Sequence, residues 1–294
     1  MPNLKAIRTR IISVKSTRQI TSAMKMVAAA KLRKAQDKIV RLRPYANKLH
    51  EILVNLSQSL AESEIENIYS RTSEPEKILI IVITSNRGLC GAFNSNVVRE
   101  ARRVVADSYY EQYKKGNVQF LAIGKKGFDY LRKHKFKFAG ESNDLLNEVT
   151  FEKASVLAEK VMKSFVIGDF NRVEIIYNHF KNAAVQQLTS EVFLPVETTP
   201  ENGKAAAHVD YIYEPDKGSI ITELIPKSLK IQFYKAVLDS FVAENGARMT
   251  AMHKATDNAT TMIRDLTLQY NKARQAAITS QILEVVSGAE ALKG

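Results

Sequence analysis

The chain has 294 residues, of which 45% are hydrophobic, and a formal net charge of +12. Its one cysteine, Cys90, excludes an internal disulfide and fits a reducing compartment. No apolar run approaches the roughly 18 residues of a membrane-spanning helix, and the N-terminus has no signal-peptide core, so the sequence predicts a cytoplasmic protein.

The positive charge is concentrated at the start of the chain. The first 50 residues contain 13 Lys and Arg against one acid, Asp37, whereas the other 244 residues contain 30 bases and 30 acids. Apolar residues recur in steps of three and four from Leu32 to Leu60, as they do at the seam of a coiled coil. We therefore predict a basic coiled-coil helix over residues 1–60.

The seam of this first helix is interrupted around Arg18 and Lys25, although apolar residues occupy the same register before the interruption. A different apolar stripe appears within it, formed by Ile20, Met24 and Val27. This second stripe indicates that the helix faces another surface there, besides its coiled-coil partner.

Residues 61–208 alternate between strand and helix patterns. A continuous apolar run at 78–83 is typical of a strand buried on both faces. Other segments follow in chain order: a helix at 94–115, a strand at 118–123, a short helix after Gly124, a helix at 151–167, and strands at 172–178 and 184–192. The alternation predicts an α/β fold with a partly parallel sheet, a small Rossmann-like domain followed by an exposed loop at 195–210.

Residues 209–294 contain a second long helix pattern. It extends from 215 to 286, and about 70 helical residues would span about 105 Å. The predicted seam includes Met252, Ala255, Ala259, Met262, Leu266, Ala273, Ala276 and Leu283. Two acids on this helix, Asp239 and Glu244, are interpreted as parts of solvated faces.

The two long helices are expected to pair as an antiparallel coiled coil, because a separate domain is inserted between them. The second helix is longer by roughly 15 residues, so its end should extend past the N-terminus. Five large apolar residues surround that end: Ile278, Ile282, Leu283, Val285 and Val286. Such an apolar end predicts that another protein encloses it.

No catalytic, cofactor or metal site is predicted. Gly88 and Gly91, or Gly124 and Gly127, form neither a GxGxxG fingerprint nor a P-loop, so tight turns explain them better than nucleotide binding. The five histidines lack metal-ligand spacing, and Cys90 has no supporting nucleophile motif. The sequence therefore does not favour an enzyme.

Four motifs carry a resemblance to a known family: Ile7–Ile11 with Thr17–Ala29, then Arg87–Gly91, Asp210–Asp216, and Tyr270–Thr279 with Val286–Ala289. Together they resemble the gamma subunit of rotary F-type ATP synthases of the bacterial type. The resemblance covers essentially the whole chain. Four motifs in the same order make it specific.

The resemblance implies a central-stalk rotor subunit of a proton-translocating ATP synthase, with no catalytic site and no cofactor of its own. It would transmit rotation of the membrane c-ring to a hexamer of three alpha and three beta subunits, coupling that rotation to ATP synthesis or hydrolysis. One gamma subunit per hexamer and an epsilon subunit complete the expected assembly. The expected location is peripheral, at the cytoplasmic face of the bacterial plasma membrane, without membrane insertion or nucleic-acid binding.

The resemblance also assigns roles to individual residues. The residues matched to contacts with the hexamer are Met24, Arg274, Gln275 and Thr279. Tyr211 and Glu214 match the foot of the shaft, which meets the ring and epsilon. At Lys25, where some relatives have an acid, this chain has a base.

The basic first helix suggests a further hypothesis, in which its exposed bases face acidic surfaces of the hexamer. The residues concerned are Lys31, Arg33, Lys34, Lys38 and Arg41. A solvated helix face is the alternative, since exposed ion pairs contribute only about 0–1 kcal/mol.

Two rival functions are a nucleic-acid-binding coiled coil and an α/β enzyme with long arms. The first lacks a recognised DNA-reading module, and the second lacks a site.

Overall fold

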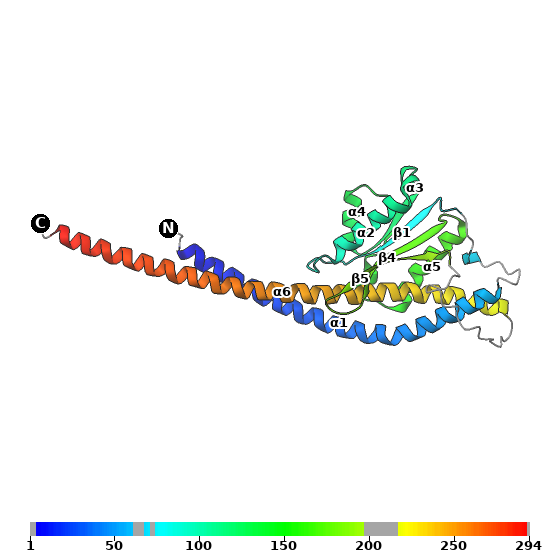
Figure 1. The fold of residues 1–294 in the computed structure, drawn as a ribbon, viewed down its shortest axis with the longest axis horizontal. Coiled ribbons are helices and arrows are strands. Elements are labelled where there is room, and N and C mark those ends of the chain that lie inside the picture. Colours follow the sequence, from blue (N-terminus) through cyan, green and yellow to red (C-terminus); the bar gives the residue numbers. More distant parts are fainter. Residues whose placement is uncertain (1–3, 61–67, 71–73, 197–216, 293–294) are drawn as a thin grey trace. The chain divides into compact units, whose positions relative to one another are not determined.

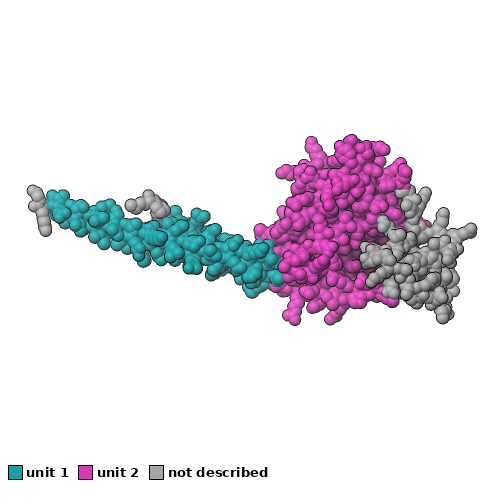
Figure 2. Space-filling view, in the orientation of Figure 1, with its two compact units in different colours: residues 1–28, 249–294 teal, residues 29–248 magenta. Residues whose placement is uncertain are grey.

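The computed structural model describes residues 4–60, 68–70, 74–196 and 217–292. The chain divides into two units: residues 1–28 with 249–294 form unit 1, and residues 29–248 form unit 2 (Figure 2). Two long helices contribute to both units, α1 (Leu4–Leu60) and α6 (Lys217–Ala291). The predicted long terminal helices are therefore confirmed.

A five-stranded sheet lies in unit 2, with the strand order β3-β2-β1-β4-β5 (Figure 1). Its strands are β1 (Ile78–Ile83), β2 (Val118–Ile123), β3 (Phe138–Glu141), β4 (Arg172–Phe180) and β5 (Gln186–Leu194). β1 pairs in parallel with both β2 and β4, β2 pairs in parallel with β3, and β5 is antiparallel to β4. The predicted Rossmann-like, partly parallel sheet is confirmed.

Shorter helices cover this sheet: α2 (Phe93–Ser108), α3 (Tyr110–Lys114), α4 (Lys125–Lys133) and α5 (Phe151–Ile167). Two 3-10 turns span Ile68–Ser70 and Asp144–Leu146. The single helix predicted at 94–115 is broken at Tyr109, whose φ of −132° and ψ of 27° leave the helical region. The break buries the Tyr109 ring and lets its hydroxyl donate to the buried carboxylate of Glu174, an interaction far along the chain.

The helices lie on opposite faces of the sheet because parallel crossovers are right-handed. The connections from β1 to β2 and from β2 to β3 each lead towards the β3 edge of the sheet, whereas the connection through α5 leads back across the sheet from β3 to β4. α5 therefore lies on the face opposite α2 and α4 (Figure 1). Along each buried strand, successive side chains point to opposite faces of the sheet, so alternate residues face the helices on each side. One core cluster joins Ile78, Ile80, Val82 and Phe120 of the sheet with residues of α2 and α4.

In unit 2, α6 packs beside α5 and against the sheet. The rings of Phe151 and Tyr234 meet edge to face at 5.7 Å, and Lys230 Nζ lies 2.5 Å from Glu159 Oε1. Desolvation raises the pKa of Tyr234, and Lys230 lowers the pKa of Glu159. Because α6 has neighbours on several sides there, most residues from 225 to 246 are buried.

α1 and α6 pair antiparallel in each unit. In unit 2, Ala46 and Leu49 of α1 pack with Ile231 of α6. In unit 1, the hydroxyls of Thr21 and Thr256 are 2.9 Å apart. Within unit 2, Arg43 also pairs with Asp239, and within unit 1, Leu4 and Ile7 line one groove with Ala273. In each unit the residue numbers therefore fall along α1 as they rise along α6, which is the predicted antiparallel pairing. Within the described residues, no helix combines the length and the hydropathy that crossing a bilayer requires.

Details of the predicted seam differ in unit 1. Thr21 and Ala28 are buried, so the register of α1 continues through the predicted interruption. Ile20 and Val27, which belong to the second predicted stripe, are 60% and 57% exposed. On α6, Met262 and Leu283 are 43% and 60% exposed, and neither belongs to a buried seam. The side chains of the last α1 seam residues and most of the predicted loop at 195–210 lie outside the described residues.

Gly124 provides the first test of this fold. Its φ is +106°, and an added Cβ would lie 2.3 Å from the Thr84 carbonyl oxygen. We expect Gly124→Ala to lower the unfolding free energy by about 2–4 kcal/mol, from backbone strain and overpacking. Urea denaturation followed by circular dichroism measures the change.

Gly288→Ala is the matched control, because nothing lies within 4 Å of an added Cβ there. Alanine favours a helix over glycine by about 1 kcal/mol, so this variant should lose no stability. Equal stabilities for the two variants would contradict the close approach at Gly124.

Candidate functional site

A buried carboxylate connects the two long helices to the sheet in unit 2. The side chain of Asp239, on α6, is 0% exposed. Its Oδ1 accepts a hydrogen bond from Arg43 Nη2 of α1 at 2.8 Å, and its Oδ2 lies 3.0 Å from His179 Nδ1 on β4. Arg43 Nη2 also donates to the carbonyl oxygen of Phe180 at 2.9 Å. α1, β4 and α6 therefore meet at the carboxylate of Asp239.

The prediction that Asp239 and Glu244 belong to solvated faces is wrong. Glu244 is 8% exposed, and its Oε1 lies 2.7 Å from Arg248 Nη1. Desolvation raises the pKa of Glu244, against the opposing effect of Arg248. The apolar run that surrounds Asp239 in the sequence, with Val237, Leu238 and Val242, was the available signal, because an acid within such a run is seldom at a solvated face.

Arg248 also supports the loop that follows β1. Its Nη2 donates to the carbonyl oxygens of Arg87 and Gly88, at 2.9 and 3.4 Å. The loop turns sharply at Leu89, which has a φ of 65° and is 64% exposed, and at Gly91, which has a φ of 61°. The predicted motif Arg87–Gly91 is thus a turn fastened to α6, with an apolar side chain at its tip.

Cys90 lies inside this turn. Asn94 Nδ2 donates to Cys90 Sγ at 3.2 Å and to Ser85 Oγ at 2.8 Å. Burial raises the pKa of the Cys90 thiol, which disfavours the reactive thiolate. These contacts agree with the interpretation of Cys90 as a buried residue of a turn.

The residues matched to contacts with a hexamer lie in unit 1, at two separate levels. Met24 is half-buried beside the Thr21 level of the helix pair, and Arg274, Gln275 and Thr279 are exposed on α6. Eighteen residues separate Arg274 from Thr256, the partner of Thr21, so the two levels are about 27 Å apart along the helix. Sequence adjacency on α6 groups the last three residues, whereas Met24 lies apart from them.

All five predicted bases of the α1 face are exposed in unit 2: Lys31, Arg33, Lys34, Lys38 and Arg41. The three lysines of this face are among the charges that lower the pKa of acids in this chain. Glu148 has its pKa lowered mainly by Lys153, with smaller contributions from Lys38 and Lys34, and Lys31 is among the charges acting on Glu244. Part of this positive charge therefore acts within the chain, on Glu148 of the α/β domain and on Glu244 of α6.

The end of α6 in unit 1 remains apolar and exposed. The exposed fractions of Ile278, Ile282, Leu283, Val285 and Val286 are 48%, 57%, 60%, 71% and 52%. A groove of about 850 Å³ lies just before this end, between the start of α1 at Leu4 and Ile7 and the small residues Ala273 and Ala277 of α6. A helix end that presents apolar side chains on many sides suits an enclosing partner.

Tyr211 and Glu214, matched to the foot of the shaft, lie outside the described residues. Among the residues that are described, no group of three or more His, Cys, Asp or Glu side chains could hold a metal ion. The described residues thus form a pair of long helices, a turn at Arg87–Gly91 that Arg248 holds to α6, and a basic surface on α1.

Comparison with known proteins gives consistent relatives. A family model described as ATP synthase matches residues 3–292. The ATP synthase gamma chain of Flavobacterium johnsoniae is 54% identical, with 100% of both chains covered, and that of Cytophaga hutchinsonii is 50% identical, with 99% of both covered. A chain in the cryo-EM structure of the Euglena gracilis mitochondrial ATP synthase, in rotational state 3, shares the fold. Its TM-score is 0.71 at 23% identity, with coverage of 98% of this chain and 94% of that one.

Removing the carboxylate of Asp239 tests the buried cluster. We expect Asp239→Ala to reduce the unfolding free energy by about 3 kcal/mol, the low end for breaking a buried ion pair, because Arg43 keeps some contact with water. Denaturant titration of the full chain measures the loss. Asp257→Ala is the matched control on the same helix, since the Asp257 side chain is 64% exposed and should change stability by less than about 0.5 kcal/mol. A neutral Asp239→Ala would refute the structural importance of the cluster.

Proposed function

We infer the function from the premise that this chain belongs to the ATP synthase gamma-chain family. It is the central-stalk rotor subunit of an F-type ATP synthase. As a subunit of that complex, it works with the alpha and beta subunits of the catalytic hexamer, with epsilon, and with the membrane c-ring. Each hexamer of three alpha and three beta subunits takes one such chain.

The observation that carries this role is the helix pair of unit 1. α1 and α6 are held together through Thr21 and Thr256, and α6 then continues with exposed apolar side chains up to Val286. Exposed apolar residues on this scale are costly in water and favour enclosure by other proteins. A hexamer that surrounds the helix end would satisfy them without requiring a fixed orientation.

Specific contacts are proposed at two levels of unit 1. Met24, on the α1 side, would meet an acidic loop of a beta subunit. Arg274, Gln275 and Thr279 would form the upper contact, where a guanidinium and an amide can donate hydrogen bonds to hexamer carbonyls. The Thr279 hydroxyl already donates to the Gln275 carbonyl oxygen at 2.9 Å, which leaves its lone pairs available as acceptors.

We propose that the chain contributes motion and no chemistry to the complex. The two glycines after β2, Gly124 and Gly127, lie close against Thr84, whose hydroxyl oxygen accepts from Gly127 N–H at 2.9 Å. Cys90 is buried in a turn. The active sites would lie in the hexamer, and rotation of this chain would change their nucleotide affinities, a coupling of binding equilibria through rigid-body motion.

Three segments would divide this work. Residues 1–60 and the helical part of 209–294 would form the shaft, and the α/β domain at 61–208 would stay outside the hexamer. Tyr211 and Glu214 would contact the ring and epsilon. The resulting location is peripheral, at the cytoplasmic face of the bacterial plasma membrane, with coupling to proton flow.

Co-assembly is the direct test of this function. The chain would be co-expressed with the alpha and beta subunits of the same genome, and ATP hydrolysis by the purified complex would be measured with and without it. We expect one copy per three alpha and three beta subunits, together with faster hydrolysis. Failure to associate would contradict the rotor role.

Charge reversal tests the basic face of α1. Arg33 and Arg41 are the two residues of this face that are not among the charges acting on Glu148 or Glu244. If the face guides assembly, Arg33→Glu with Arg41→Glu should lower the yield of complex at low salt, and the difference should shrink as salt screens the charges. The yield is measured by size-exclusion chromatography.

Lys133→Glu with Lys160→Glu is the matched control, with the same change of charge on exposed helices of the α/β domain. The control should assemble as the unaltered chain does. Equal yields for both double variants at every salt concentration would contradict a role in assembly for Arg33 and Arg41.

A further inference from the structure

A groove of about 470 Å³ is lined by residues of α2 and α4. These two helices lie on the side of the sheet opposite α5 (Figure 1). Arg99 and Arg102 enter the groove from α2, and Lys126 and Tyr130 enter it from α4. Its volume falls within the range of about 300–1,000 Å³ that small-ligand sites occupy. The rotor role described above gives this groove no task.

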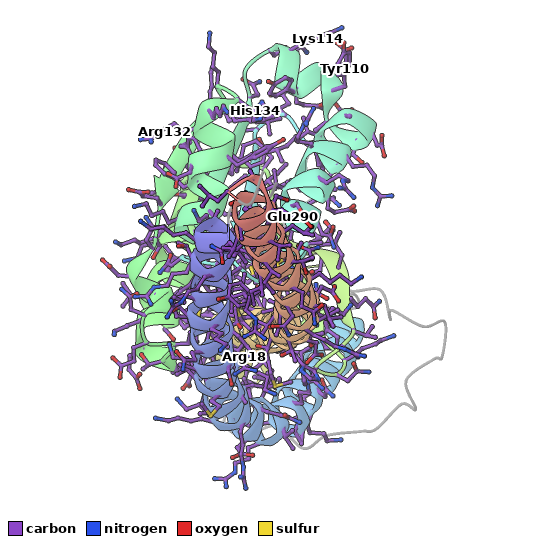
Figure 3. All side chains as sticks on the ribbon, turned by 90° about the vertical axis from the view of Figure 1, so that its left-hand side faces the viewer. Arg18, Tyr110, Lys114, Arg132, His134 and Glu290 are labelled. Carbon is purple, nitrogen blue, oxygen red and sulfur yellow. The ribbon has the colours of Figure 1, made fainter. Side chains whose placement is uncertain are left out.

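The groove gathers positive charge without a counter-ion. None of the described residues that line it is acidic. The two nearest acids in the sequence are already engaged, since Glu100 Oε1 lies 2.5 Å from Arg103 Nη2 and Asp129 Oδ1 lies 3.9 Å from Arg132 Nη2. Arg132 also stacks over Phe128 and projects outward from α4 (Figure 3). Like charges that line one groove repel one another, and a bound anion would relieve that repulsion.

The polar groups of the groove are partly arranged in advance. Arg102 Nη1 donates to the Tyr130 hydroxyl at 3.3 Å, a contact that joins the two walls. Ser95, in the first turn of α2, adds a hydroxyl next to the positive end of the helix dipole. Val98 and the ring of Tyr130 supply the apolar part of the lining.

We propose that this groove binds a small phosphorylated ligand. The planar guanidinium groups of Arg99 and Arg102 match phosphate oxygens in bidentate geometry, and Lys126 adds a mobile point charge. Tyr130 and Val98 would contact the rest of the ligand. Because the volume exceeds what one phosphate ion fills, a nucleotide fits this chemistry better than inorganic phosphate does.

Calorimetric titration of the purified full chain, without the hexamer and its own nucleotide sites, tests the proposal. The probes are ADP, inorganic phosphate, adenosine and a short glutamate-rich peptide. We expect ADP to bind, adenosine to bind at least tenfold more weakly, and Arg99→Gln with Lys126→Gln to weaken ADP binding at least tenfold. Lys133→Gln with Lys160→Gln is the matched control and should bind ADP as the unaltered chain does.

The titrations also identify the source of the phosphate. ADP that binds more tightly than inorganic phosphate, with the difference lost in Tyr130→Ala, supports a nucleotide, whereas equal affinities for the two support a free-phosphate site. Circular dichroism confirms that each variant is folded. Absence of binding by both phosphate probes, equal losses in the two double variants, or binding of the acidic peptide alone would overturn the proposal. None of these outcomes bears on assembly with the hexamer.

Discussion

Asp239 is a charge that the fold keeps out of water, and the arrangement of unit 2 depends on the partners that surround it. Removing a carboxylate from water is costly, and Arg43 of α1 and His179 of β4 supply the contacts that offset this cost. An apolar seam with a seven-residue repeat tolerates a shift by one repeat, whereas a single buried ion pair does not. The cluster therefore specifies how α1, α6 and the sheet meet, as Arg248 does for the turn after β1.

Local patterns predicted much of the fold. β1, β2 and α5 begin and end where their apolar runs and flanking turn residues indicated, because each is a long or fully buried segment. β3 was missed because four residues, with a glycine among them, show too little alternation. The break at Tyr109 was missed for another reason, since its cause is Glu174 on β4, which no window of the sequence around Tyr109 contains.

The candidate functional residues were less accessible to sequence reasoning. Helical spacing correctly predicts a pair of helices, but it cannot show that α6 has the sheet as an additional neighbour. For that reason it predicts solvated faces for Asp239 and Glu244, which are buried. The basic face of α1 was identified as exposed, yet the effect of Lys34 and Lys38 on Glu148 depends on the tertiary fold. Arg274, Gln275 and Thr279 rest on family resemblance, because an exposed helical residue carries no local sign of its partner.

The uneven charge of unit 1 has an electrical consequence for a rotor. Residues 1–28 hold six bases and no acid, whereas residues 249–294 hold five bases and four acids. The charge of the helix pair is therefore uneven across the shaft, and its more positive edge lies on α1. A stationary neighbour within a Debye length, about 8 Å at physiological ionic strength, would sense that edge once per revolution. Three equivalent neighbours would sense it one third of a cycle apart, so the angular position of the shaft is encoded in electrostatic potential as well as in shape.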